Sequence, residues 1–385
     1  MWFIPESKLD EYQKRFLEEE DVTKNNYWLR GFPGSGKSIL LAHSIKKIKN
    51  KDPKARIAVV VYTHAMIAMF KTAFREMDIS VPIMTVYDRS LGGSNYDYIL
   101  CDEVQDMTPS TLKKLRGTSK RITVSGDENQ SIYDYDVRYG ERTVGSTDIS
   151  DLVQAKPFLL NMIHRLSRSI INCVQKLLPF LNIFNGKRDM TKKDTQVRIC
   201  EADDTYEEAE YIIKEAEKRA NIGESSAILL PTHNAVLDFV QRVFNIKNVE
   251  NWDIKLDKWG NTDYDNLNSY FQENNIKMQY VGNRFGKFDE IVNKINIMTY
   301  HSSKGLDFDN VFMPGLNKSL YITPKENLNE TVFMVAMTRS RNNLYLTYSG
   351  EMHNYLRKFF SDCSIINIHD TTSTVESTDD DIFGF

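Results

Sequence analysis

A glycine-rich segment near the N-terminus has the residue types and the spacing of a phosphate-binding loop. It fits the pattern GxxxxGK[ST] with Gly31-Phe-Pro-Gly34-Ser35-Gly36-Lys37-Ser38. Such glycines let backbone N–H groups and a helix N-terminus face an anion. In this pattern the Lys37 ammonium reaches the β- and γ-phosphates of a nucleotide, and the Ser38 hydroxyl binds Mg²⁺. The segment therefore predicts a nucleoside triphosphate site.

The elements that flank this segment are those that a phosphate loop requires. A strand is expected at Tyr27–Arg30, directly before it, and an apolar helix at Ile39–Ile48, directly after it. The alternative is a glycine-rich turn that arose by chance, and the strand and helix context argues against it.

Two adjacent carboxylates follow a second apolar run. Asp102 and Glu103 come directly after Tyr98–Cys101. Strand ends in a doubly wound sheet point toward the ligand crevice. Asp102 therefore suits a magnesium site, and Glu103 suits a general base that orients water. The alternative is a solvated acidic turn that also contains Asp106, and the nearby phosphate loop disfavours it.

Short apolar runs alternate with helical patterns along the chain, which predicts an α/β protein with mainly parallel sheets. A helix-rich stretch from Phe158 to Leu181, interrupted by Pro179, separates two sets of strands. The expected strands are Tyr27–Arg30, Arg56–Tyr62, Tyr98–Cys101 and Arg121–Ser125, then Gln196–Cys200, Ala227–Leu230, Ile295–Thr299, Asn310–Met313 and Leu344–Tyr348. Polar residues crowd positions 183–195, so we expect lobes at 1–182 and 183–368 and an acidic tail at 369–385.

Composition sets broad limits on function. The 385 residues allow two to three domains at roughly 100–200 residues each. The 49 Lys and Arg against 53 Asp and Glu give a formal net charge of -4, which opposes a DNA-coating protein but allows one basic channel. The four cysteines form no CxxC pair, so we expect reduced thiols without zinc or disulfides. No signal or membrane-spanning segment is evident, which predicts a cytoplasmic protein.

Further segments resemble the motifs of UvrD/Rep-type DNA helicases of superfamily 1A, in the order that the family has. The segments are Asp102-Glu-Val-Gln-Asp106 (DEAQD), Gly126-Asp-Glu-Asn-Gln130-Ser-Ile-Tyr133 (GDxxQSIY), Thr299-Tyr-His301-Ser-Ser-Lys304-Gly305-Leu-Asp307-Phe308 (TxHxxKGLEF) and Val335-Ala-Met-Thr338-Arg339-Ser340 (VAxTRA). The resemblance implies two RecA-like P-loop lobes that bind ATP and Mg²⁺ in a cleft between them.

The resemblance also implies catalytic roles around the γ-phosphate, where negative charge grows during hydrolysis. Gln130 would sense that phosphate. Arg339, from the second lobe, would be an arginine finger, and Arg165 would be another. The alternative for each arginine is an ordinary surface charge. It is stronger for Arg165, because the family's Tyr-Arg-Ser has become His-Arg-Leu-Ser here.

Four residues would complete the nucleotide site. Gln13 stands where the family has the glutamine that reads adenine. His164 replaces a tyrosine that stacks on adenine, although it could equally be a surface histidine. Gly305 and Asp307 belong to the second lobe's share of the site. Asp307 stands for a ribose-binding glutamate and is one methylene shorter.

The resemblance implies contacts with a single nucleic-acid strand as well. The implied residues are Tyr62, Thr63, His64, Tyr133, Tyr135, Thr299 and His301. Tyr62 and Tyr135 are the ones expected to stack on bases. Packing in the core is the alternative, because the chain has 19 tyrosines. Asp134 and Asp136 would also repel phosphate.

Two accessory domains of larger family members, 1B and 2B, have little room in this chain. Only Ala65–Asp97, with a strand expected at Ile83–Val86, fills the first position, and residues 245–290 fill the second. We therefore expect a minimal core. A protein partner could supply the missing function.

The end of the chain is an acidic run followed by apolar residues, Asp379-Asp-Asp-Ile382-Phe383-Gly-Phe385. It is similar to the docking peptide of bacterial single-stranded DNA-binding proteins. It could instead cover the protein's own DNA groove, or serve only as a solubilising tail.

Three functions remain open at this stage. The first is a translocase or helicase on single-stranded DNA, with 3′→5′ polarity implied by the family. The second is a nucleic-acid-stimulated ATPase subunit of a repair or defence complex that does not unwind by itself. The third is an NTPase switch without nucleic acid. The choice between DNA and RNA also stays open, because contacts of this kind are mainly to backbone and base faces.

Overall fold

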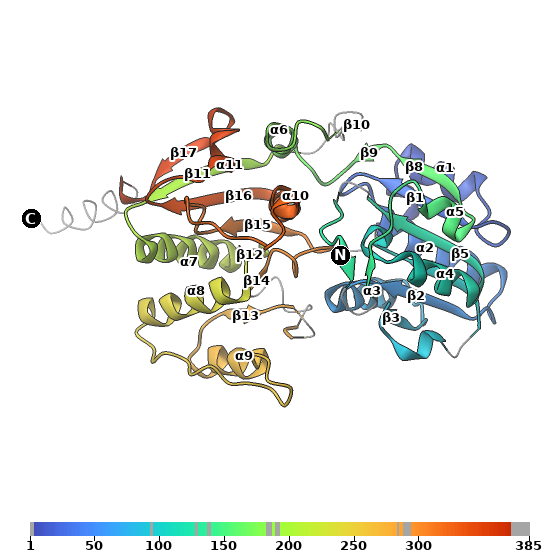
Figure 1. Cartoon of the computed structure of the whole chain (residues 1–385), viewed down its shortest axis with the longest axis horizontal. Helices are drawn as coiled ribbons and strands as arrows, with labels where there is room; N and C mark the ends of the chain where they lie inside the picture. Colours follow the sequence, from blue (N-terminus) through green and yellow to red (C-terminus); the bar gives the residue numbers. More distant parts are fainter. Residues whose placement is uncertain are drawn as a thin grey trace, which may run out of the picture. The chain divides into compact units, whose positions relative to one another are not determined.

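The computed structural model describes residues 4–92, 95–127, 130–136, 140–181, 187–188, 193–282, 285–287 and 294–370 (Figure 1). The chain forms two compact units. One comprises Met1–Leu166 and Leu181–Lys192, and the other comprises Ser167–Phe180 and Lys193–Phe385. Each unit has its own parallel sheet flanked by helices, which confirms the predicted α/β class with two RecA-like lobes.

The first unit contains a six-stranded parallel sheet in the order β3-β2-β4-β5-β1-β8. Its strands are β1 (Tyr27–Gly31), β2 (Ile57–Val61), β3 (Ile83–Thr85), β4 (Tyr96–Cys101), β5 (Ser119–Gly126) and β8 (Lys156–Leu160). Its α-helices are α1 (Glu11–Glu19), α2 (Lys37–Lys51), α3 (His64–Glu76), α4 (Pro109–Gly117) and α5 (Ile149–Val153). Shorter elements are η1 (Glu6–Lys8), η2 (Arg89–Gly92), η3 (Val104–Asp106), β6 (Tyr135–Asp136), β7 (Glu141–Arg142), β9 (Met162–Ile163) and β10 (Lys187–Arg188).

The strand order brings three important strand ends to one edge of this sheet. β5 pairs with both β1 and β4, with Arg30 opposite Gly126 and Cys101 opposite Val124. Parallel neighbours end at the same edge. The segments that follow β1, β4 and β5 therefore lie side by side. They are the glycine-rich loop, the Asp102–Glu103 pair and the turn after Gly126.

The second unit contains a seven-stranded parallel sheet in the order β13-β14-β12-β15-β16-β11-β17. Its strands are β11 (Gln196–Ala202), β12 (Ser226–Leu230), β13 (Met278–Tyr280), β14 (Ile295–Thr299), β15 (Phe308–Met313), β16 (Ser340–Ser349) and β17 (Ser364–Asn367). Its helices are α6 (Arg168–Leu177), α7 (Thr205–Asn221), α8 (His233–Ile246), α9 (Tyr264–Glu273), α10 (Glu326–Met337), α11 (Asn354–Arg357) and the short η7 (Phe360–Asp362).

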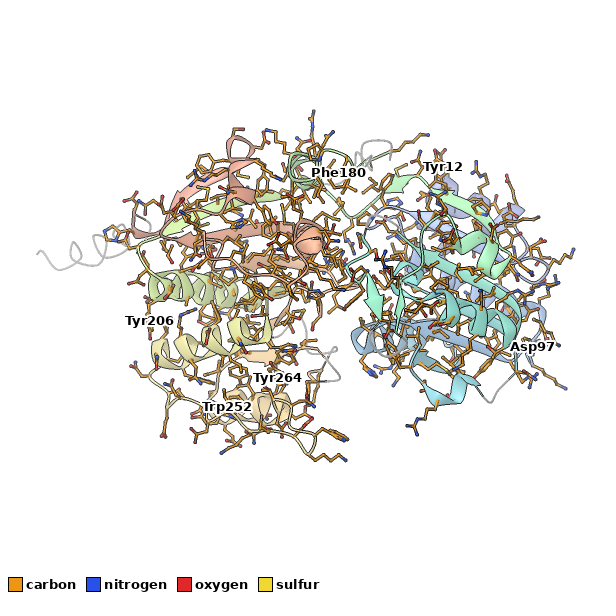
Figure 2. All side chains as sticks on the ribbon, viewed as in Figure 1. Tyr12, Asp97, Phe180, Tyr206, Trp252 and Tyr264 are labelled. Carbon is orange, nitrogen blue, oxygen red and sulfur yellow. The ribbon has the colours of Figure 1, made fainter. Side chains whose placement is uncertain are left out.

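Part of the described stretch within residues 245–290 packs into the core of the second unit. Trp252 and Tyr264, labelled in Figure 2, are buried in the same apolar cluster as Phe239 of α8 and Ile297 of β14. In the first position, residues 65–97 form the rest of α3, β3, η2 and the start of β4, apart from two residues outside the description. Neither stretch contains a separate domain among the described residues, as the minimal-core hypothesis expects.

The prediction of a helix-rich stretch from Phe158 onward is wrong for its first residues. Residues 156–160 form β8, an edge strand that pairs with β1 and buries Phe158 and Leu160. Pro157 is tolerated there, because an edge strand can leave one backbone position unbonded. The helix that does form, α6, lies in the second unit, whereas the sequence assigned it to the first lobe. β13 and β17 were also not predicted.

Most residues of the expected acidic tail and of the expected domain boundary lie outside the part of the chain that the structure describes. Of residues 369–385, only His369 and Asp370 are described, and of residues 183–195, only 187–188 and 193–195. In the described part of the chain, none of the helices is long and apolar enough to cross a membrane.

Glu208 of α7 is a carboxylate buried in the second unit. Its Oε1 accepts hydrogen bonds from the Gly315 N–H at 2.8 Å and from the Thr347 hydroxyl at 2.5 Å. Burial raises the pKa of Glu208 above its ordinary value of 4.5. A carboxyl group with a raised pKa in the folded state favours folding at low pH. This contribution is lost as the pH rises from the unfolded pKa through the folded one.

We therefore expect Glu208→Gln to gain stability relative to the natural chain as the pH rises through that window, because the amide does not ionise. Free energies of unfolding in denaturant at a series of pH values measure the difference. Glu210→Gln, on the exposed face of the same helix, is the control and should not show this trend. A Glu208→Gln difference that is flat with pH, or that slopes the other way, would contradict the assignment.

Candidate nucleotide site

The glycine-rich loop has the backbone conformation that phosphate binding requires. Gly34 and Gly36 both have positive φ, at 72° and 83°, and Gly36 caps the N-terminus of α2. The Lys37 ammonium donates hydrogen bonds to the carbonyls of Gly31 at 2.8 Å and Phe32 at 3.2 Å. The Ser35 hydroxyl is buried and has no hydrogen-bond partner among the described residues. A phosphate oxygen would give it one.

The predicted magnesium residues meet at the end of the sheet. The Ser38 hydroxyl donates to Asp102 Oδ2 at 2.5 Å, and the Ser125 hydroxyl donates to Oδ1 of the same carboxylate at 2.5 Å. Burial raises the pKa of Asp102, and the neighbouring Glu103 carboxylate raises it further. A hydroxyl beside a carboxylate supplies the hard oxygen ligands that Mg²⁺ prefers, so these residues fit that ion.

Glu103 is held by a glutamine that the sequence analysis did not select. The Gln105 amide donates to Glu103 Oε2 at 2.5 Å, and its Oε1 accepts from the Asp127 N–H at 3.2 Å. Glu103 itself has a positive φ of 59°, unusual for a residue other than glycine. Gln130 is buried in the turn that follows β5. Its backbone N–H donates a hydrogen bond to the Asp127 carbonyl at 3.0 Å. Gln105 thus connects the expected general base to the segment that carries the expected sensor.

Gln13 and His164 both contact the phosphate loop, through different atoms. The Gln13 amide donates to the Ser35 carbonyl at 3.0 Å, and its Oε1 accepts from the Asp10 N–H at 3.1 Å. The His164 N–H donates to the Gly34 carbonyl at 3.0 Å, and its Nε2 lies 2.5 Å from Asp10 Oδ2. Asp10 was missed, although its spacing of three from Gln13 is the signature of a helix capping box.

Arg165 lies against the same loop. A Cβ added at Gly34 would lie 2.1 Å from the Arg165 Cβ, so the two backbones are in close contact. The structure therefore brings the segment of the second expected arginine to the phosphate loop within the first unit. Which atoms its guanidinium binds during catalysis stays a prediction.

In the described part of the first unit, a small hollow lies at this edge of the sheet and a larger one at the opposite edge. One of about 50 Å³ is lined by Arg30, Gly31, Gly126 and Asp127, where β1 and β5 end. A larger one of about 570 Å³ lies at the opposite edge, beside Ile57 and Tyr96, where β2 and β4 begin. None of the residues that line the larger hollow was selected for chemistry.

Two of the tyrosines expected to bind nucleic acid form a cluster with a third. The Tyr62 and Tyr133 ring centroids are 5.0 Å apart. The Tyr87 hydroxyl lies 3.1 Å from that of Tyr62 and 2.8 Å from Asp136 Oδ2. Burial raises the pKa of Tyr62. Tyr87 was missed because it follows β3 with no motif around it. The side chain of Tyr135 lies outside the described residues.

The remaining two residues of that set in the first unit begin α3. The Thr63 hydroxyl accepts a hydrogen bond from the Met66 N–H at 3.3 Å, which caps the helix, and His64 is its first residue. Thr63 therefore has a structural role that its sequence position alone would explain.

The selected residues of the second unit gather after β14. The Thr299 hydroxyl accepts from the Ser302 N–H at 3.1 Å and shapes the turn that carries His301. Burial lowers the pKa of His301, and the Lys304 ammonium lowers it further. Gly305 closes the turn with a φ of 83°, and Asp307 is half-buried beside it.

Arg339 is tied to the same turn. Its guanidinium donates to the carbonyls of Val335 at 2.8 Å and Leu306 at 3.1 Å, and to the Thr338 hydroxyl at 3.2 Å. Its own carbonyl accepts from the Phe308 N–H at 2.9 Å. The two motifs of the second unit thus form one neighbourhood.

Comparison with known proteins agrees with these two neighbourhoods. Residues 13–136 match the model of an AAA domain, and residues 241–351 match the UvrD-like helicase C-terminal domain. Residues 241–351 thus form a UvrD-like helicase C-terminal domain, and the chain is similar to UvrD/Rep-type proteins of helicase superfamily 1. The two matches cover the P-loop with both carboxylates and the Thr299 and Arg339 segments.

Individual relatives of this UvrD/Rep-like chain are distant. A putative ATP-dependent DNA helicase of Acanthamoeba polyphaga mimivirus is 25% identical over 283 residues, 69% of this chain and 36% of its own length. The ATP-dependent DNA helicase Rep of Buchnera aphidicola is 35% identical over 75 residues, 18% of this chain and 11% of its own. The chain thus spans about a third of the length of the mimivirus relative.

A solved complex of an arterivirus helicase, nonstructural protein 10, with DNA aligns with 85% of this chain and 61% of its own. The identity is 15% and the TM-score is 0.41. A likeness this loose adds nothing to the argument.

The contact between Gly34 and Arg165 leads to a prediction. Gly34→Ala should weaken nucleotide binding by roughly tenfold or more, because the left-handed backbone alone costs about 1–2 kcal/mol and the new methyl group collides with Arg165. Titration with a fluorescent ATP analogue measures the affinity. Gly223→Ala is the matched control, because it has the same backbone strain at φ 80° with open space around it. Equal affinity in the natural chain and Gly34→Ala would contradict the packing argument.

Proposed function

We propose that this chain hydrolyses ATP with Mg²⁺ and uses the energy to move along single-stranded DNA. The observation that carries the proposal is the meeting of Ser38 and Asp102 at the strand end beside the phosphate loop, with Glu103 next to them. Phosphate, magnesium and an attacking water each have a matched group within one unit. ATP as substrate also supports a cytoplasmic site of action.

Each residue of the site has a definable task. Lys37 leaves the two carbonyls it now contacts and binds the β- and γ-phosphates. Ser38 and Asp102 would hold a magnesium ion, whose positive charge would offset the negative charge of the phosphate oxygens. Glu103, oriented by Gln105, accepts a proton from the attacking water. Gln130 would contact the γ-phosphate, and its movement would be passed to the tyrosine segment that directly follows it.

The nucleotide base would meet Gln13 and His164. The Gln13 amide now bridges Asp10 and the Ser35 carbonyl, so reading adenine and shaping the loop involve the same side chain. In the second unit, Arg339 would act as an arginine finger on the γ-phosphate, with Gly305 and Asp307 near the sugar. Exchanging its present carbonyl partners for phosphate oxygens would couple hydrolysis to movement of the second unit.

Nucleic acid would be held by residues of both units, namely Tyr62, Thr63, His64, Tyr133, Tyr135, Thr299 and His301. The clustering of Tyr62 with Tyr133 supports an aromatic platform at the end of the first sheet. The direction of movement that we propose is 3′→5′. RNA is the alternative track.

This mechanism predicts how ATP turnover responds to DNA and to substitution. Single-stranded DNA should stimulate turnover. Glu103→Gln should lower it by roughly 10²–10⁴-fold, the value of a positioned general base. Arg339→Ala should lower it by roughly 10³–10⁵-fold, the value of an arginine finger. A coupled assay of ADP release with and without an oligonucleotide measures all three.

Two variants serve as matched controls. Glu18→Gln removes an exposed carboxylate of α1, and Arg341→Ala removes an arginine of β16 that pairs with Asp309 instead. Both should keep turnover near that of the natural chain. Undiminished turnover in Arg339→Ala would refute the arginine finger, and undiminished turnover in Glu103→Gln would refute the general base.

A second candidate function is a nucleic-acid-stimulated ATPase subunit of a repair or defence complex, without unwinding of its own. It is favoured by the short stretches at 65–97 and 245–290, which contain no separate domain among the described residues. A partner protein would then supply strand separation, and the acidic segment from residue 369 onward is where we propose that it docks.

A strand-displacement assay separates the two candidates. We expect the chain to displace a strand from a duplex with a 3′ single-stranded tail and not from one with a 5′ tail. DNA-stimulated ATP turnover without displacement from either substrate would favour the subunit. Displacement from the 5′-tailed substrate alone would overturn the proposed direction.

A further inference from the structure

In the second unit, a cysteine of α6 faces a cysteine of the segment that follows η7. Cys173 lies on α6 and is fully buried, whereas Cys363 directly follows η7 and is half-buried. The Lys176 ammonium forms an ion pair with Asp362 Oδ2 at 2.5 Å. Cys173 precedes Lys176 by three residues and so shares its helix face. The ion pair therefore places Cys173 opposite Cys363, the neighbour of Asp362.

Further contacts fix this arrangement. The Lys358 ammonium donates to the Leu177 carbonyl at the end of α6 at 3.2 Å and pairs with Glu330 of α10 at 2.6 Å. The Cys363 thiol donates to the Phe359 carbonyl at 3.5 Å, which leaves its sulfur lone pairs as acceptors. A hydrogen bond to Cys363 raises the pKa of Cys173, and burial raises it further. Together with the Lys176–Asp362 ion pair, this places the two thiols within hydrogen-bonding reach of each other.

We propose that Cys173 and Cys363 form a thiol–disulfide site that hydrogen peroxide oxidises. Their 190-residue separation in the chain, 363 minus 173, gave no sequence signal for the pair. The site is independent of the proposed ATPase function.

The chemistry balances in two steps. The half-buried Cys363, as its thiolate, attacks the peroxide oxygen and becomes a sulfenic acid, and one water leaves. The Cys173 sulfur then attacks the sulfenic sulfur, the S–S bond forms and a second water leaves. Overall, the two thiols lose two protons and two electrons, and one molecule of hydrogen peroxide is reduced to two waters. A dithiol reductant reverses the oxidation by thiol–disulfide exchange.

The cross-link would act on the helix through which the chain passes between the units. The chain enters α6 from the first unit after Leu166 and returns to that unit at Leu181. A disulfide would tie this helix to the C-terminal segment of the second unit. The other two cysteines, Cys101 in β4 and Cys200 in β11, are fully buried, and the Cys101 sulfur lies 3.5 Å from the Met107 sulfur. We expect both to stay reduced.

Hydrogen peroxide on the purified full chain tests the site, with peptide mass mapping under non-reducing conditions. The expected product is one intrachain disulfide between the peptides of Cys173 and Cys363, which dithiothreitol reverses and which raises the midpoint of thermal unfolding. Cys363→Ser should leave Cys173 reduced, and Cys173→Ser should leave Cys363 to oxidise beyond the sulfenic acid. Disulfides between molecules, disulfides to Cys101 or Cys200, or a sulfinic acid at Cys363 beside a reduced Cys173 would overturn the proposal.

A second measurement uses the natural chain and does not depend on the folding of a variant. Phenylarsine oxide, a trivalent arsenical, bridges two thiols only when they are adjacent. We expect one equivalent to bind to the reduced chain and to protect both cysteines from alkylation. Absence of binding, or binding that protects neither residue, would overturn the proposal.

Discussion

The hydrogen bond between the Ser38 hydroxyl and the Asp102 carboxylate is the contact on which the rest of the site depends. It joins the first turn of α2 to the end of β4, although β5 lies between β4 and β1, the strand that leads into the loop. The Ser125 hydroxyl, at the end of β5, binds the other oxygen of the same carboxylate. Three elements are thus locked at the positions where a nucleotide and its metal ion need them.

Two glutamines extend this constraint outward. Gln105 binds Glu103 with its amide nitrogen and the segment of Gln130 with its oxygen. Gln13 binds the Ser35 carbonyl and the start of α1 in the same way. An amide has both donors and an acceptor, so one side chain can connect two segments. Any group that displaces one of these bonds must therefore disturb two parts of the site, which is a direct physical route from nucleotide to protein motion.

Much of this arrangement could be predicted from the sequence. The P-loop, both carboxylates and the ten expected strands, such as Arg56–Tyr62 and Ile295–Thr299, carry local patterns of apolar runs and glycines. All ten expected strands form. β8 was lost because its apolar residues run on into the helix that follows, and Pro157 weakens a strand pattern. Its edge position becomes evident only once β1 is seen to need a second neighbour.

Two of the missed contacts share one physical reason. Asp10 contacts His164 across 154 positions of the chain, and Tyr87 meets Tyr62 and Asp136 only through the folded sheet. Such partners depend on tertiary register, which no local pattern encodes. The proposed action of Arg339 on ATP likewise depends on how the second unit moves, whereas Val335, Leu306 and Thr338, which its guanidinium contacts, lie in its own unit.

The most direct test of this account is a double-mutant cycle on the contact that closes the metal site. Ser38→Ala, Asp102→Asn and the double variant would be titrated with Mn²⁺ in the presence of a non-hydrolysable ATP analogue, with the bound ion followed by electron paramagnetic resonance. If the two side chains hold one ion together, each single change should weaken Mn²⁺ binding and the double change should cost much less than the sum. Additive losses, or a natural chain that binds Mn²⁺ no better than the double variant, would contradict the account.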